Sequence, residues 1–271
     1  MTILSTNMSE LKSKNYKDLY PKNGLSHVTG STESTLLNAT IPQLLKESVS
    51  KFGGKDALVF SNQRLTYSDF DQAVDELAVG FLALGLNKGD RLGIWSPNRL
   101  EWVLTQFATA RIGVILVNIN PAYRASELEY SLNKVGCKAL VLAEKFKSSE
   151  YLEMIYKLAP EINICNRGEL QAKNLPKLQH VIVMGDVEVS NGLWLFDEIK
   201  NLGGSKEKLK LSEIEKDLTP HDAINIQFTS GTTGQPKGAT LSHFNIVNNA
   251  IFTTERINLT ENDRLAIPVP L

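Results

Sequence analysis

The sequence predicts an α/β protein whose doubly wound, mostly parallel sheet lies between layers of helices. Short apolar segments alternate with amphipathic helical segments in a β-α-β-α-β-α-β order between residues 57 and 142. That order favours parallel strands joined by right-handed crossovers. Residues 114–117 are apolar at every position, which is typical of a strand that helices cover on both faces.

The first elements are expected from about residue 36 onwards. Thr40 can cap a first helix, and strands at residues 57–60 and 65–67 follow it, separated by a turn. Ser68 is the predicted cap of the next helix, whose residues recur with helical spacing. The apolar face of that helix consists of Phe70, Val74, Leu77, Ala78, Phe81 and Leu82.

The next part of the chain continues the alternation. Ser126 and Glu129 have the spacing of a capping box, so a helix should begin there and end at Gly136. After residue 143 the pattern is weaker, and the charged residues 206–217 fit either a solvated helix or a linker. The other expected elements are strands at 91–95, 114–117, 139–142 and 180–184 and helices at 151–158 and 193–202.

Composition narrows the class of protein. The chain has 271 residues, 42% of them hydrophobic and 22% charged, with a formal net charge of −1, which argues against a dominant nucleic-acid or membrane-surface field. Cys137 and Cys165 are far apart, so a disulfide framework or zinc site is not expected. The most apolar run, residues 102–119, is interrupted by Arg111 and is too short to span a bilayer.

One stretch near the end has a composition that folding alone rarely requires. It combines four hydroxyl side chains, three glycines, a proline and a lysine: Thr229, Ser230, Gly231, Thr232, Thr233, Gly234, Gln235, Pro236, Lys237 and Gly238. Glycines allow close approach to the backbone, successive N–H groups bind anions, and lysine adds positive charge. The stretch is therefore predicted to wrap phosphates.

The surroundings of this loop exclude the commonest phosphate-binding motif. Alternating residues at 224–229 and 239–242 predict a strand on each side, followed by a helix. A Walker A loop would require glycine where Pro236 stands and Ser or Thr where Gly238 stands. An exposed hairpin that binds nothing remains the alternative, because turns favour the same residues.

The loop resembles the signature of the adenylate-forming superfamily, which includes acyl-CoA synthetases, luciferases and peptide-synthetase adenylation domains. That signature reads Ser/Thr-Ser-Gly-Ser/Thr-Thr-Gly-x-Pro-Lys-Gly, and every defined position matches. Further similarity, closest to mitochondrial medium-chain acyl-CoA ligases, covers residues 36–271 and includes residues 65–70, 89–94, 117–124, 224–229 and 238–249.

The resemblance implies a two-step reaction with ATP, Mg²⁺ and CoA. A fatty-acid carboxylate attacks the α-phosphorus of ATP and releases pyrophosphate, and the CoA thiol then displaces AMP from the acyl-adenylate. The implied roles are hydroxyl donation by Thr229, Ser230, Thr232 and Thr233, N–H donation by Gly231 and Gly234, charge compensation by Lys237 and turn shaping by Pro236. No catalytic or metal-binding residue is assigned, and His243 is expected to be structural.

The resemblance also sets the expected organisation. Residues 1–35 form a disordered tail or a weak targeting segment, residues 36–215 a first α/β subdomain, and residues 216–271 the start of a second. The chain ends within an apolar run at 266–271, so we expect the front part of a longer protein, without its C-terminal lid domain and inactive alone. The expected location is the mitochondrial matrix by resemblance, and otherwise the cytoplasm. A carrier-protein-loading enzyme and an inactive nucleotide-binding fragment are the alternatives.

Overall fold

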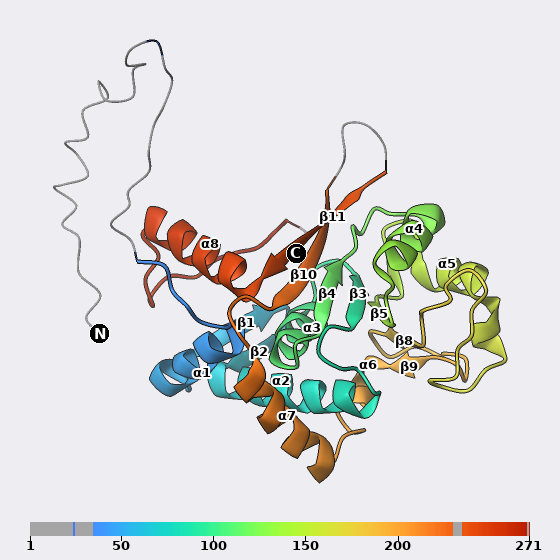
Figure 1. The fold of residues 1–271 in the computed structure, drawn as a ribbon, viewed down its shortest axis with the longest axis horizontal. Coiled ribbons are helices and arrows are strands. Elements are labelled where there is room, and N and C mark those ends of the chain that lie inside the picture. The colour runs from blue at the N-terminus through green and yellow to red at the C-terminus, as the bar shows by residue number, and fades with distance from the viewer. Residues whose placement is uncertain (1–23, 25–34, 230–234, 270) are drawn as a thin grey trace. The chain divides into compact units, whose positions relative to one another are not determined.

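The fold is described from a computed structural model, which describes residues 24, 35–229, 235–269 and 271. The chain divides into two compact units, Met1–Leu36 and Leu37–Leu271, and every element below belongs to the second. Its centre is a seven-stranded sheet (Figure 1). The strands in spatial order are β11 (Lys237–Ser242), β10 (Ala223–Thr229), β4 (Ile115–Asn118), β3 (Arg91–Trp95), β5 (Ala139–Leu142), β8 (His180–Val183) and β9 (Trp194–Leu195).

All neighbouring strands of this sheet are parallel except β10 and β11, which are antiparallel. Helices cover both faces (Figure 1). This arrangement confirms the predicted α/β class with a doubly wound, mostly parallel sheet. The larger helices are α1 (Ile41–Phe52), α2 (Tyr67–Ala83), α3 (Leu100–Arg111), α4 (Ala125–Val135), α5 (Tyr151–Leu158), α7 (Ser205–Asp217) and α8 (His243–Arg256).

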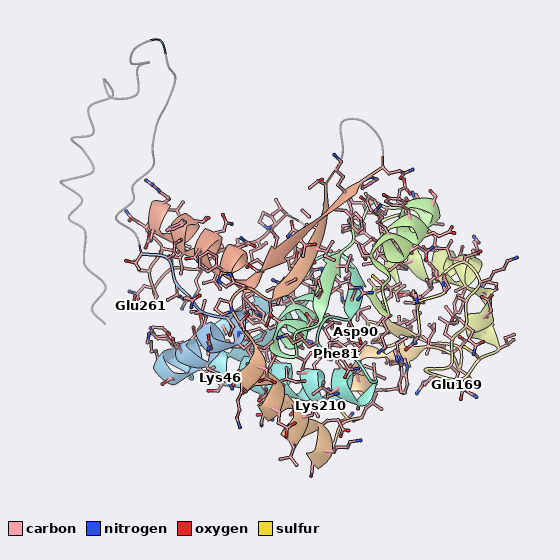
Figure 2. All side chains as sticks on the ribbon, viewed as in Figure 1. Lys46, Phe81, Asp90, Glu169, Lys210 and Glu261 are labelled. Carbon is pink, nitrogen blue, oxygen red and sulfur yellow. The ribbon has the colours of Figure 1, made fainter. Side chains whose placement is uncertain are left out.

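Two hydrophobic cores lie on opposite faces of the sheet because successive strand residues point in opposite directions. In β3, Leu92 and Ile94 belong to the core formed with α2 and α3, whereas Trp95 belongs to the core formed with α4 and α5. All six predicted apolar residues of α2 are buried. Figure 2 shows Phe81 of this face in the interior, whereas Glu169 is exposed.

The strand that opens the predicted β-α-β order does not join the parallel sheet. Strands β1 (Asp56–Phe60) and β2 (Gln63–Thr66) instead pair with each other in a separate antiparallel hairpin. The link between them is only two residues long, and Ser61 has a φ of 53°. A parallel pair needs a crossover of a dozen or more residues, so this short link permits only antiparallel pairing. The prediction for this strand was therefore wrong.

Two predicted helix caps are also wrong, although Thr40 and Ser242 cap their helices as side-chain chemistry suggests. Helix α2 begins two residues earlier than predicted, because Thr66 Oγ1 accepts a hydrogen bond from Asp69 N at 3.1 Å. Helix α4 begins at Ala125, where Glu127 Oε2 accepts a hydrogen bond from Arg124 N at 3.0 Å. The cap is the residue with extended backbone, which the hydroxyl pattern alone does not identify.

The region after residue 143, where the sequence pattern is weak, contains short elements that extend the core. Residues 206–217 are helical within α7, and Leu211 is buried in the first core, so this stretch is a packed helix and not a linker. Within the described ranges, no helix is long and apolar enough to cross a membrane. The remaining elements are β6 (Lys145–Phe146), β7 (Ser149–Glu150), a 3₁₀ helix (Pro160–Asn163) and α6 (Phe196–Ile199).

Candidate phosphate-binding site

The candidate loop is the connection of the β10–β11 hairpin. Thr229 is the last residue of β10 and pairs with Lys237, the first residue of β11. Thr229, Gln235, Pro236, Lys237 and Gly238 are described, so both ends of the predicted loop have known positions. The other five predicted residues lie outside the described part of the chain: Ser230, Gly231, Thr232, Thr233 and Gly234.

The loop emerges at the carboxyl edge of the parallel sheet. Strand β10 is parallel to β4, and Gln227 lies beside Asn118, the last residue of β4. Thr229 therefore lies beyond the carboxyl end of β4, and the hairpin projects from the sheet at this edge (Figure 1). In open α/β sheets, ligands bind in the crevice outside the carboxyl ends of the strands. The topology thus places the predicted phosphate loop where this fold binds ligands.

Both described ends of the loop are held by specific contacts. Thr229 Oγ1 donates a hydrogen bond to the carbonyl oxygen of Lys237 at 3.4 Å, across the hairpin. The Tyr130 hydroxyl, on α4, donates to the carbonyl oxygen of Pro236 at 3.2 Å. At Gly238, an added Cβ would lie 3.0 Å from Ile226 Cγ2, which leaves little room for a side chain. These contacts define where the loop begins and ends.

Lys237 supplies an available positive charge at the end of the loop. The residue is exposed, and among the described residues it forms no ion pair. No described carboxylate therefore neutralises its ammonium group, which can attract an anion. Because Lys237 directly follows Pro236, its backbone position is tied to the contact with Tyr130.

A partly buried pair of amide side chains lies deeper in the same part of the sheet, and sequence reasoning missed it. Asn225 is 2% exposed, and its Nδ2 donates to Asn118 Oδ1 at 3.2 Å, which links β10 to β4 through side chains as well as backbone. The alternation at residues 224–229 places Asn225 on the strand face opposite the apolar residues, where a polar side chain is expected to be exposed. No local signal identifies its partner, which is 107 residues away.

His243 has a structural position, which supports its expected role. The side chain is fully buried at the start of α8, and Nδ1 accepts a hydrogen bond from Ile41 N at 3.2 Å. Burial lowers the pKa of His243 to about 4, so the ring is neutral near pH 7. Asn248, one turn further on, accepts from Leu37 N at 2.8 Å. The start of α8 thus holds the chain segment that leads into α1.

The other conspicuous aromatic residues pack against the two cores. Trp95 stacks on Tyr151 with a 3.7 Å distance between ring centroids, and Trp102 is 4% exposed in the first core. Tyr123 is partly buried against the second core, where burial and the nearby Glu127 raise the pKa of its hydroxyl. These environments are those of packing residues.

The described residues contain no group of three or more His, Cys, Asp or Glu side chains placed to hold a metal ion. Cys137 is a buried free thiol, and burial raises its pKa to about 12, so it is not a thiolate ligand at neutral pH.

Comparison with known proteins agrees with this geometry. The family described as AMP-binding enzyme matches residues 45–271. The proteins named medium-chain acyl-CoA ligase ACSF2, mitochondrial, from Macaca fascicularis and Danio rerio are each 46% identical, and the aligned region covers 93% and 91% of this chain and 41% of each relative. The chain therefore spans about two fifths of their length.

A solved structure with a similar fold is that of a long-chain-fatty-acid-CoA ligase (FadD1) from Archaeoglobus fulgidus. The superposition has a TM-score of 0.66 and covers 88% of this chain and 44% of that protein, with 24% sequence identity. The likeness at this identity concerns the fold.

Proposed function

This chain belongs to the family of AMP-binding enzymes, and we propose from that premise that it is the N-terminal part of an ATP-dependent medium-chain acyl-CoA ligase. The position of the β10–β11 loop carries this proposal. The loop lies at the carboxyl edge of the sheet, with an unpaired lysine at its end among the described residues. The names of the relatives from macaque and zebrafish support the acyl-CoA product and the medium-chain substrate class.

The proposed reaction has two displacement steps. A carboxylate oxygen of the fatty acid attacks the α-phosphorus of ATP, the bond to the β-phosphate oxygen breaks, and pyrophosphate leaves. The CoA sulfur then attacks the acyl carbon of the acyl-adenylate, the bond from that carbon to the AMP oxygen breaks, and AMP leaves while the thiol proton is released. Negative charge increases on pyrophosphate as it departs, so preorganised donors around the β- and γ-phosphates lower the barrier of the first step.

The loop residues are proposed to supply these donors. Lys237 would offset the charge of the departing pyrophosphate, and Pro236 would shape the turn that precedes it. The remaining donors are the hydroxyls of Ser230, Thr232 and Thr233 and the N–H groups of Gly231 and Gly234, with Gln235 and Gly238 completing the loop. The Thr229 hydroxyl, which donates to the Lys237 carbonyl oxygen at 3.4 Å, would turn from that oxygen to the phosphate when ATP binds. Mg²⁺ is proposed to enter bound to the phosphates of ATP.

Location and domain organisation follow from the same proposal. A mitochondrial matrix location is supported by the mitochondrial designation of the relatives. Residues 36–215 are proposed as a first subdomain and residues 216–271 as the start of a second, to which the loop would belong.

The direct test is carboxylate-dependent exchange between ATP and radiolabelled pyrophosphate, measured on the protein with any part that extends beyond residue 271. A series of carboxylic acids should give the fastest exchange at medium chain length, and addition of CoA should yield acyl-CoA. Lys237→Ala should slow exchange at least about 100-fold, the range for a lost transition-state donor. Lys206→Ala, at an exposed position in α7, is the matched control. Exchange that needs no carboxylic acid, or that Lys237→Ala leaves unchanged, would refute the proposal.

A further inference from the structure

We propose that Tyr130 is a positioning residue for the phosphate loop: its hydroxyl fixes the peptide unit that joins Pro236 to Lys237. This inference rests on the proposed function, because it assigns Tyr130 a role in placing the groups that bind ATP. Tyr130 lies on α4, outside the loop and 106 residues before Pro236. Its contact with Pro236 is the structural basis of the inference.

The contact acts on the one peptide unit that matters most for Lys237. Tyr130 donates its hydroxyl hydrogen to the carbonyl oxygen of Pro236 at 3.2 Å, with both residues partly buried. The Pro236 carbonyl and the N–H of Lys237 belong to the same planar peptide unit. Holding the carbonyl oxygen therefore also sets the direction of that N–H and of the chain entering Lys237.

The hairpin has little other support at this point. In the described part of the chain, strand β11 is an edge strand of the sheet and pairs with β10 alone, and residues 237–240 are exposed. Among the described residues, the last backbone pair of the hairpin is Thr229 with Lys237. Pro236 has no N–H and cannot add another ladder bond, so only its carbonyl is available as an anchor. Tyr130 occupies that anchor.

Helix α4 is well suited to serve as the support. Leu128 and Leu132 are buried in the second core, so the helix is fixed to the sheet. It is capped by Glu127 and ends at Gly136 in the left-handed conformation, with φ 63°. Val135, on the same helix, lies near Gly238, where an added Cβ would be 3.8 Å from Val135 Cγ1. The helix therefore contacts the hairpin at Pro236 and lies close to it at Gly238, on the two sides of Lys237.

Removing the hydroxyl isolates this contact because phenylalanine keeps the ring. A neutral hydrogen bond contributes about 1 kcal/mol net, which corresponds to about a fivefold change. In the exchange assay, Tyr130→Phe should lower kcat/KM for ATP about fivefold and leave the KM for the carboxylic acid unchanged. Tyr156→Phe is the matched control. The Tyr156 hydroxyl donates a hydrogen bond to Ser190 Oγ over a distance of 3.4 Å, and neither residue belongs to the loop. A general loss of structure would not separate the two substrates in this way.

A second measurement separates failure of this inference from failure of the proposed function. Amide hydrogen exchange of the peptide covering residues 235–241, in the unliganded protein, should be faster in Tyr130→Phe and unchanged in Tyr156→Phe. If the unmodified protein shows no carboxylate-dependent pyrophosphate exchange, the proposed function fails, and the assigned role of Tyr130 fails with it. If the unmodified protein is active but Tyr130→Phe changes neither the ATP parameters nor the hydrogen exchange, the inference alone is overturned.

Discussion

Replacing Arg111 by methionine is expected to destabilise the protein by about 3 kcal/mol. Arg111 lies in the last turn of α3, and its side chain is fully buried. Its guanidinium group donates hydrogen bonds to Asp71 and Asp75, which are one turn apart on α2. Glu215 of α7 lies 3.8 Å from Arg111 Nε, so one cation joins three helices.

The stability cost of Arg111→Met depends on the two carboxylates that lose their positively charged partner. Burial alone would lower the pKa of Arg111, but hydrogen bonds and charge from Asp71 and Asp75 outweigh burial and raise the pKa. Without the cation, these carboxylates would repel each other beside an apolar side chain. Asp71 is 22% exposed and Asp75 48% exposed, so water partly compensates them. This places the cost at the lower end of the roughly 3–5 kcal/mol range for breaking a buried pair.

Replacing Asp71 and replacing Asp75 should cost different amounts of stability, because water reaches the two side chains to different extents. Asp71→Asn removes a charge-assisted hydrogen bond at a mostly buried position and should cost about 2 kcal/mol. Asp75→Asn acts at a half-exposed position, where screening by water limits the cost to about 1 kcal/mol or less. Urea unfolding followed by circular dichroism would measure each change, with Lys206→Ala as a surface control. The reverse order of the two aspartates, or a cost below about 1 kcal/mol for Arg111→Met, would contradict this reasoning.

Three further predictions concern other parts of the fold. The pKa of His243 is about 4 in the folded protein and about 6.5 in the unfolded chain, so its contribution to stability is complete above pH 6.5 and falls by about 2 kcal/mol between pH 7 and pH 5. The urea midpoint should therefore drop less over this pH range in His243→Gln than in the unmodified protein, and an equal drop would exclude His243 as the cause. Asn98→Asp should speed hydrogen exchange at residues 265–271, since Asn98 Nδ2 donates to the carbonyl oxygens of Ile267 at 3.0 Å and Val269 at 2.7 Å, and unchanged exchange would argue against this clamp. Gly80→Ala should lower stability by about 2 kcal/mol despite the better helix propensity of alanine, because its Cβ would lie 2.0 Å from a backbone oxygen of α6; a thermal melt with an unchanged or higher midpoint would refute the clash.

Regular elements were predictable where one local pattern dominates. The bounds of β3 and β5 and of α5 agree with the sequence prediction, because each is a distinct apolar or amphipathic run with its own period. The β1–β2 hairpin was misplaced, since an isolated apolar run does not reveal which strand it pairs with.

The site was predictable only in part, because its chemistry is local but its support is not. The residues of the loop carry a compositional signal, whereas Tyr130 contacts Pro236 across 106 residues of sequence. Asn248 was missed for the same reason: its partner Leu37 is 211 residues away. A buried polar residue appears in the sequence as an ordinary surface residue until the fold supplies its partner.

The order of the strands places the predicted phosphate loop and an apolar segment at the same edge of the sheet. The phosphate loop follows β10, and Asn98, which holds the apolar segment around Ile267, lies just after the carboxyl end of β3. Only β4 separates these strands, so the two carboxyl ends are roughly 10 Å apart at the usual strand spacing. The predicted phosphate loop and an apolar segment therefore begin along the same edge of the sheet. A reaction that joins an apolar carboxylic acid to a nucleotide phosphate requires such a pairing, which supports the proposed ligase activity.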